Sequence, residues 1–554
     1  MTSFFASACC RKPLGALLLA LLVLWALPAS AQQSAFDTSW LAEEKEADLE
    51  GDEDGIKLSL DEAVTLSLSN NLGLRVERFR RAQDLFRIQQ QEGIYDFNLA
   101  FNAGLDESTT AAVTVLAGAD VAEAENQFFN LQLRQLVSTG GTFGIDYNNR
   151  RSESNSQFQL LNPSFNLNFD AVYTQPLLRD AGRLATERGI RVAQTNARIG
   201  LENLKTSIVN TVQQVENAYW TLVAAREQLA VDQQSLGLAE QLHEMNKVQV
   251  RVGTKAPLEL IQSEVGIATR QEAIILSQAA VEDAEDDLKQ LLNLPVETLW
   301  ERSIVPVTEA EIDRLSIDLD GAIGTSLNQR PELVAQRNTL KNLELDSKFF
   351  AQQKKPTLNL EARYGYSGIG GDTLVLAPGS SPFDPNPDGM ILPGGYGDAL
   401  EQITDLEFDA WSIGFNFNFP LQNRAAKAAS TIADLALAQG ETELANLILQ
   451  VRTEVRRAAR LVLTGAEQID SAKKSRELAE RNLEAEQKRY ENGLSTSFQV
   501  LEIQEDLSLA QTRVVNAVTG YRRAIVDFFR SIGTLLPESG IEIDDIEDRN
   551  ALKP

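Results

Sequence analysis

Two kinds of hydrophobic pattern occur along the 554-residue chain, and the first has a period of two. In WSIGFNFNFP, residues 411–420, apolar side chains alternate with Ser, Gly and Asn, which is typical of a β-strand with two different faces. Residues 97–106, 165–174 and 358–366 alternate in the same way, with Asn, Asp, Glu or Arg at the polar positions. Each segment has about 9–11 residues, the length that a tilted strand needs to cross a bilayer.

The second pattern steps by three and four residues, over residues 208–229 and 448–490. A mean step of 3.5 residues indicates a left-handed coiled coil. The stripe is rich in Ala and Gly, so we expect the helices to approach closely. Arg226, Arg476 and Glu486 also fall on it, which fits helices that have neighbours on two sides and one edge open to water.

The helix lengths predict a rod. Residues 180–250 and 425–490 would form helices on the order of 100 Å long at 1.5 Å per residue. Four shorter helices of roughly 50 Å each are predicted by the same rise, at residues 60–93, 257–292, 319–353 and 497–532. Two short helices placed end to end therefore match one long helix. Such a rod has no compact core of its own, so we expect copies of the chain to close its seams.

The chain also repeats itself. AVTLSLSNNLGL from residue 63 resembles AIGTSLNQRPEL from 322, YTQPLLRDAGR from 173 resembles FNFPLQNRAAK from 417, and VRVGTKAPLELIQSE from 250 resembles YENGLSTSFQVLEIQ from 490. The offsets are 259, 244 and 240 residues. This period is too long for a solenoid, so we interpret the chain as two homologous halves.

The predicted strands require partners from other chains. A soluble sandwich would give the same alternation, but six strands at most, scattered among long helices, cannot close a sheet within one chain. Several chains can close one, and a closed barrel leaves no unpaired edge in lipid. Trp411, Tyr364 and Tyr366 would then lie at the outer rim, and Pro176 and Pro420 would end the descending strands. We interpret the Gly- and Pro-rich residues 368–405 as an external loop.

The net charge of the chain limits the kinds of partner that it can bind. The formal charge is −28, and without residues 1–31, which hold Arg11, Lys12 and no acids, it is −30. This acidic excess argues against nucleic acid as a partner.

Residues 1–31 have a basic start, a short apolar run and Ala29-Ser30-Ala31, the pattern of a secretory signal. Cys9 and Cys10, the two cysteines of the chain, would leave with that signal.

The sequence is therefore divided into six segments. These are a signal peptide (1–31), an acidic leader (32–55), a first structural repeat (56–295), a linker (296–318), a second structural repeat (319–536) and an acidic tail (537–554).

Taken together, the chain resembles the TolC-like outer-membrane efflux proteins over nearly all of residues 56–536. The resemblance is carried by the doubled halves, by NNLGL at Asn70 and QRPEL at Gln329, by the strand-Pro-Leu-helix junctions, and by the turns RVGT and NGLST. It implies an α+β membrane protein with two internal repeats, a long antiparallel coiled-coil helical tunnel, and transmembrane β-barrel strands shared in a homotrimer.

The resemblance also implies a place and a function. Such a protein lies in the outer membrane of a Gram-negative bacterium and extends into the periplasm. It is a passive exit duct for efflux or type I secretion, coupled to an inner-membrane pump through a periplasmic adaptor, the membrane fusion protein. One departure is an additional hairpin at residues 128–151, since the family has two strands per half. Either the barrel is larger or the hairpin lies outside the membrane.

The resemblance places adaptor contacts on the two helical turns at the far end, as part of a ring of six turns in a trimer. The residues that match the family's motif in part are Val252, Gly253, Thr254, Gly493, Leu494, Ser495 and Thr496. Asn492 replaces a Val of the motif. A glycine that ends each helix is also expected from the turn itself.

Family members often carry two acids at i, i+3 just past each turn, where they surround the pore. Here those places hold Glu259 and Gln262 in the first half and Gln499 and Glu502 in the second, with Tyr490 before the turn. We expect these residues at the pore entrance, with Glu259 and Glu502 favouring cations. A solvated helix face would give the same pattern.

Enzyme functions are not supported. His243 is the only histidine, and we interpret it as a surface residue; the sequence has no GxxxxGK[ST] phosphate loop. We therefore expect no catalytic residue, no cofactor and no metal site. The alternative functions are a structural coiled-coil tether that spans the envelope, or a passive porin, and the cargo leaves no trace in the sequence.

Overall fold

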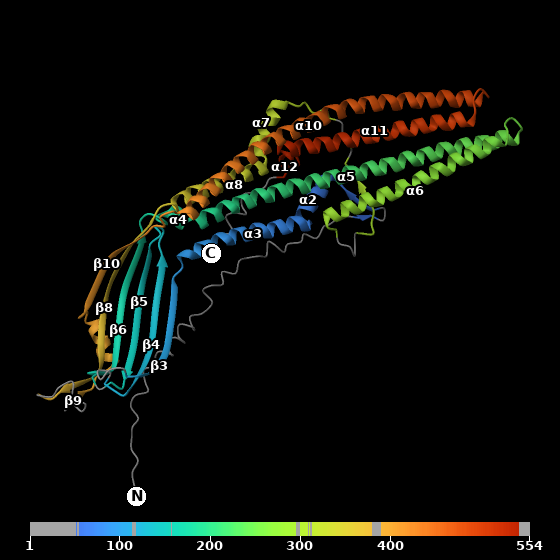
Figure 1. The fold of residues 1–554 in the computed structure, drawn as a ribbon. Coiled ribbons are helices and arrows are strands. Elements are labelled where there is room, and N and C mark those ends of the chain that lie inside the picture. The colour runs from blue at the N-terminus through green and yellow to red at the C-terminus, as the bar shows by residue number, and fades with distance from the viewer. Residues whose placement is uncertain are drawn as a thin grey trace, which may run out of the picture.

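The computed structural model describes residues 51–52, 55–112, 118–156, 158–294, 300–308, 310, 313–378 and 389–541. The predicted signal peptide, most of the acidic leader, and the tail from residue 542 lie outside these residues, as does part of the linker. A sheet forms one end of the molecule, and long helices run away from it to the other end (Figure 1).

Six long strands form one antiparallel sheet. They are β3 (Asn98–Ala111), β4 (Val121–Leu136), β5 (Thr142–Ser154), β6 (Leu161–Pro176), β8 (Thr357–Leu376) and β10 (Asp409–Asn418). Their spatial order is β10-β8-β6-β5-β4-β3. The four strands predicted from the alternation are confirmed. The additional hairpin is β4 and β5, and it lies inside this sheet between β3 and β6 (Figure 1).

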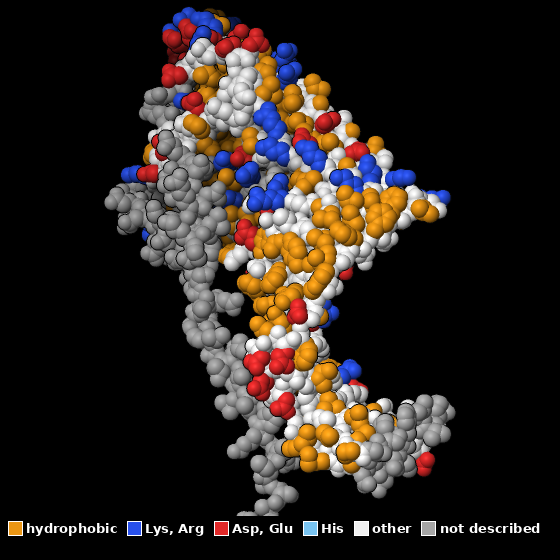
Figure 2. Space-filling view, turned by 90° about the vertical axis from the view of Figure 1, so that its left-hand side faces the viewer, with side chains coloured by type: hydrophobic (Ala, Val, Ile, Leu, Met, Phe, Trp, Pro, Cys, Tyr) orange, Lys and Arg blue, Asp and Glu red, His pale blue; other side chains and the backbone are white. Residues whose placement is uncertain are grey.

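The strand register gives the sheet one apolar and one polar face. Cross-strand neighbours on the apolar face include Phe101, Leu131, Tyr147, Phe169 and Tyr366. The adjacent row on the polar face holds Asn102, Asn130, Asn148, Asn168 and Ser367. Figure 2 shows a broad area of hydrophobic side chains on the side of the molecule that includes β10.

The prediction of a plain loop over residues 368–405 is wrong. β8 continues to Leu376, β9 (Gly389–Leu392) pairs with it, and α9 (Tyr396–Thr404) packs against β8 and β6. Ala399 and Ile403 of α9 cover Leu167 on the apolar face. The helix forms because these apolar residues recur at a spacing of four, beside Gly- and Pro-rich segments that hide the pattern.

The helices match the predicted ranges closely. They are α2 (Leu60–Asn70), α3 (Leu72–Glu92), α5 (Arg188–Arg251), α6 (Leu258–Leu292), α7 (Leu319–Gln329), α8 (Pro331–Gln352), α10 (Arg424–Glu491) and α11 (Ser497–Ile532), with short pieces η3 (Gly93–Tyr95), α4 (Arg183–Thr186) and α12 (Leu535–Glu538). The 64 residues of α5 and the 68 of α10 span about 96 and about 102 Å. Within the described part of the chain, no helix combines the length and the apolar character needed to cross a bilayer.

Two helices predicted as continuous are broken, one in each half. The Asn71 side chain accepts a hydrogen bond from the Leu74 N–H at 3.1 Å, so it ends α2 and caps α3. In the second half Pro331 opens α8, and Arg330 before it takes an extended conformation with φ −64° and ψ 122°. The two breaks occupy the same place in the repeat.

The breaks explain how short helices match a long one. α3 and α6 both lie along α5, and the Asn71 side-chain amide donates to the Leu291 carbonyl at the end of α6 at 3.0 Å. α8 and α11 both lie along α10. Gly533, which follows the last residue of α11, lies so close to the break that a Cβ atom added to it would be 3.3 Å from the Arg330 nitrogen. Contacts between α5 and α11 join the halves.

A small sheet and two tyrosines hold the linker to the rod. β2 (Gly55–Leu58) pairs with β1 (Gly51–Asp52) and, in parallel, with β7 (Ile304–Pro306). The buried Tyr219 hydroxyl donates to the Leu58 carbonyl and accepts from the Thr308 N–H, each at 3.0 Å. Tyr521 does the same on the other half, donating to the Asp313 carbonyl at 2.7 Å. The linker therefore connects the halves at mid-length of the rod.

Candidate functional site at the helical tips

The rod ends in two turns of the same geometry, at the opposite end from the sheet (Figure 1). Gly253 has φ of +80°, and its N–H donates to the Val250 carbonyl at 3.1 Å. The Thr254 N–H donates to the Gln249 carbonyl at 2.9 Å. Gly493, with φ of +74°, makes the corresponding turn after α10. Both positions need a left-handed conformation that glycine adopts without strain.

The turns present apolar side chains to solvent. Val252 is 66% exposed and Leu494 is 70% exposed, and Leu258 and Phe498, each in the first turn of the following helix, are similarly exposed. Among the predicted adaptor-contact residues Ser495 is buried instead, with its hydroxyl on the Glu486 carboxylate. The exposed surface of the tips is therefore apolar at both turns.

Polar contacts hold the two turns together. The Lys255 ammonium donates to the Ser495 carbonyl at 3.2 Å and lies 4.3 Å from the centre of the Tyr490 ring. The Tyr490 hydroxyl donates to the side-chain oxygen of Asn246, which is fully buried. Burial and the nearby Glu259 carboxylate raise the pKa of Tyr490 to about 12, so the hydroxyl keeps its proton at physiological pH.

Glu259 makes a further contact between the halves. Its carboxylate accepts hydrogen bonds from the Ser497 N–H at 3.0 Å and from the Ser497 hydroxyl. Ser497 is the first residue of α11, so Glu259 of α6 places a negative charge at the N-terminus of another helix. The Gln262 side-chain oxygen also accepts from the Ser497 hydroxyl, at 3.3 Å.

The five residues predicted at the pore entrance thus have different surroundings. Glu259 and Gln262 meet at Ser497, the Gln499 side chain accepts from Ser495 at 2.9 Å, Glu502 is exposed on α11, and Tyr490 is buried. Asn246, Lys255 and Ser497 could not be predicted from the sequence, because they act through contacts between residues about 240 positions apart. Glu486 stands out in the sequence only as a charge on the helical stripe.

His243, predicted to lie on the surface, is partly exposed and also contacts a neighbouring helix. Its ring is half-buried, and Nδ1 lies 2.8 Å from the Ser263 hydroxyl of α6. The Ser263 hydroxyl also lies within hydrogen-bonding distance of the Glu259 and Leu260 carbonyls of its own helix. The histidine therefore links α5 to α6 near the tips.

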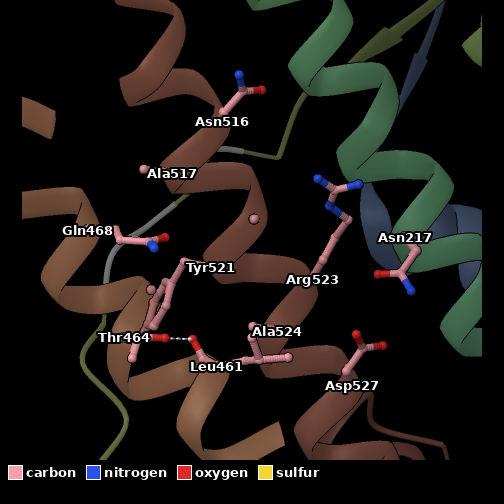
Figure 3. Close-up of a pocket in the computed structure, with 12 residues that line it drawn as sticks. Asn217, Leu461, Thr464, Gln468, Asn516, Ala517, Tyr521, Arg523, Ala524 and Asp527 are labelled. Carbon is pink, nitrogen blue, oxygen red and sulfur yellow. Dashed lines mark hydrogen bonds between the residues drawn. The ribbon is translucent and has the colours of Figure 1, made fainter. Parts of the chain in front are cut away.

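An open cavity of about 430 Å³ lies between α10, α11 and α5, nearer mid-length (Figure 3). Small residues leave the space, among them Gly465 and Gly520, and polar side chains line it. Arg523 and Asp527 bring one charge of each sign, and the Gln213 side chain donates to Asp527 at 2.6 Å. The lining therefore has no excess of either charge.

Comparison with known proteins gives consistent results. A family model described as "Outer membrane efflux protein" matches residues 142–294 and 322–534. The pyoverdine export outer membrane protein OpmQ of Pseudomonas putida is 22% identical over 403 residues, which cover 71% of this chain and 77% of that protein.

Solved structures share the fold. The CmeC outer membrane channel of Campylobacter jejuni aligns with a TM-score of 0.63 at 16% identity and covers 89% of both chains. The outer membrane protein VceC of Vibrio cholerae aligns with a TM-score of 0.61 at 15% identity, over 86% of this chain and 96% of VceC. The family match begins at the first residue of β5, so β3 and β4 precede it.

Proposed function

The chain belongs to the outer membrane efflux protein family, and we propose that three copies assemble around one axis into a passive conduit. The protein is an outer-membrane channel that serves as an exit duct for efflux. In this proposal the sheets of the three copies lie in the membrane and the helical rods enclose a periplasmic tunnel. The conduit works with an inner-membrane pump and a periplasmic adaptor. It catalyses no reaction and binds no nucleic acid.

One observation carries this proposal: a rod about 100 Å long joins an apolar-faced sheet to two matched turns with exposed apolar residues. A rod of this length has seams that a single chain leaves open. Three copies would bring six turns together at one end. The polar faces of their sheets would all face a common interior.

The first experiment is conductance of the purified protein in a planar bilayer. A conducting trimer supports the duct, whereas a protein that inserts without conducting would be a tether. The second experiment separates a pump exit from a porin. The double variant Val252→Asp/Leu494→Asp should bind the cognate adaptor at least tenfold more weakly, because it places two charges on the apolar tips.

Leu406→Asp is the matched control for adaptor binding. Leu406 is 58% exposed and follows α9 at the sheet end of the molecule, away from the tips. Its substitution should leave adaptor binding unchanged. Equal binding by wild type and by the double variant would place the adaptor elsewhere on the rod.

A further inference from the structure

Among the residues that the structure describes, the sheet of one copy ends in two unpaired edges, β3 and β10. Building on the trimer proposed above, we propose that β10 of each copy pairs with β3 of the next, and that the closed barrel has eighteen strands. Each copy contributes six, because the hairpin β4–β5 is part of the sheet. All ten residues of β10 are exposed in the single chain, including Trp411, Ile413 and Phe415.

The hairpin has the two faces that a barrel wall needs. On the apolar face Leu131 and Leu133 of β4 pair with Tyr147 and Ile145 of β5, and this row continues into β3 and β6. A hairpin that lay outside the membrane would gain nothing from such a face. The five residues between β4 and β5 form a tight turn at the helical end, where the Gly182 N–H donates to the Thr139 carbonyl at 2.8 Å. The hairpin is therefore fixed to the start of the rod.

The strand directions permit closure. All neighbours in the sheet are antiparallel, so with six strands β3 and β10 run in opposite directions. Pairing between copies is then antiparallel as well, and three copies give an even number of strands, as in bacterial outer-membrane barrels. Closure also removes both unpaired edges from the lipid.

The stagger of the strands also fits a barrel. One row of paired residues runs from Leu99 on β3 to Trp411 on β10. Asn98 and Asn418 are the ends of β3 and β10 that lie next to the helices. Leu99 lies one residue from Asn98, whereas Trp411 lies seven residues from Asn418. The stagger is therefore six residues over six strands. A barrel with one residue of stagger per strand has strands tilted by about 36°.

These ends define the register between copies. If Asn418 of one copy lies level with Asn98 of the next, Phe417 faces Leu99 and Phe415 faces Phe101. On the apolar face Ile413 and Trp411 then meet Ala103 and Leu105 in the same way, because the stagger is an even number and keeps each face in line. The same register brings aromatic rings together across the junction, where they stabilise strand pairing.

The wider barrel would have a polar lumen. Its lining repeats the row of four asparagines in each copy, and next to it lie two ion pairs, Arg134 with Asp146 at 2.5 Å and Arg363 with Asp170. Barrel diameter grows roughly in proportion to strand number. An eighteen-stranded barrel would therefore be about one and a half times as wide as a twelve-stranded one.

Disulfide trapping in the full-length protein tests the junction. The variant Phe415→Cys/Phe101→Cys should form covalent trimers after oxidation in the membrane, because directly opposite residues lie within disulfide range. The control Phe415→Cys/Ala103→Cys has the same apolar face but a register shifted by two residues, and should cross-link at least fivefold less. Covalent dimers without trimers would mean a twelve-stranded ring of two copies and would overturn the proposal. Equal cross-linking of the control would overturn the register.

Hairpin deletion tests the width. Residues 113–157 are replaced by Asn-Gly, which joins β3 to β6 and keeps Asn102 level with Asn168. The largest polyethylene glycol that enters the barrel from the external side should then have a diameter about one third smaller than in the wild type. An unchanged exclusion limit would show that the hairpin does not line the lumen. If this variant fails to assemble, the cross-links still decide the matter.

The outcomes separate this inference from the proposed function. A full-length protein that conducts as a trimer but does not cross-link through β10 and β3 refutes the eighteen-stranded barrel alone. A full-length protein that neither trimerises nor conducts refutes the proposed function as well.

Discussion

Single hydroxyl groups connect distant segments of this chain. Tyr219 and Tyr521 each use one buried hydroxyl to hold a carbonyl and an N–H of the segments around the linker. The Thr308 N–H donates to the Tyr219 hydroxyl, whereas the Leu58 carbonyl also accepts a hydrogen bond from the Val307 N–H at 3.1 Å. A buried backbone group that loses its partner costs more than the hydrogen bond itself contributed.

Tyr219→Phe should therefore destabilise the protein. The ring still fills its site, but the Thr308 N–H loses its partner and the Leu58 carbonyl keeps only the Val307 N–H, which should lower the free energy of unfolding by about 1–3 kcal/mol. Thermal unfolding in detergent, followed by circular dichroism, measures the effect. Tyr364→Phe, at a residue 46% exposed, serves as the control and should change stability by less than about 0.5 kcal/mol. Equal effects of both would contradict this role of Tyr219.

Glu216 makes stability depend on pH. The side chain is 6% exposed, and burial, together with Asp61, raises the pKa of its carboxyl group, although the Ser539 hydroxyl donates to it. A raised folded-state pKa means that stability falls as pH rises through that pKa, because the folded state then holds a proton that the unfolded state has lost. Glu216→Gln should raise the melting temperature at pH 8 and lose this advantage near pH 4. Exposed Glu240→Gln should give no pH-dependent difference, and a constant shift for Glu216→Gln would refute the argument.

Helical hairpins are the elements that the sequence predicts best. Their stripes repeat every 3.5 residues over 20 to 40 positions, and α11 begins and ends where expected, at Ser497 and Ile532. α9 was missed because nine residues beside glycines and prolines give little periodic signal. The position of β4–β5 in the sheet could not be predicted, since strand order depends on contacts between segments far apart in sequence. For the same reason the sequence marked the turns but not the contacts that join them.

Those contacts should hold the tips in the arrangement seen here. Tyr490→Phe removes the donor to buried Asn246, and Lys255→Met removes the cation above the ring. Each change should weaken the contact between the two turns by about 1 kcal/mol. In the double variant, the equilibrium between joined and separated turns should therefore shift toward separated turns more than tenfold. Single-channel recording should show a larger mean conductance than wild type. Lys247→Met, at an exposed pair with Glu244 on the same helix, is the control; an unchanged conductance of the double variant would mean that these contacts do not restrict the tunnel.

At the scale of the whole molecule, charge and symmetry act together. Three copies would multiply a formal charge of −28 per chain, and any carboxylate near the axis would occur three times. Like charges around a narrow passage attract cations and repel anions. Of the two predicted entrance carboxylates, Glu259 and Glu502, the exposed one is Glu502 on α11, so it is the best place to test this effect.

Glu502→Gln should therefore weaken cation preference. One charge at about 6 Å in water contributes about 0.7 kcal/mol, so the cation-to-anion permeability ratio should fall about threefold. Reversal potentials in a salt gradient measure this ratio. Glu240→Gln, on the exposed side of α5, should leave the ratio unchanged, and an unaltered ratio in Glu502→Gln would place that carboxylate away from the permeation path.

The parallel pairing of β2 with β7 also sets an order for biogenesis. β2 lies near residue 56 and β7 near residue 304, so about 250 residues must follow β2 into the periplasm before it finds its partner. Contacts between such distant segments form late, because closing a long loop costs chain entropy. The small sheet at the middle of the rod therefore cannot be completed until the whole first half and the start of the linker have been exported.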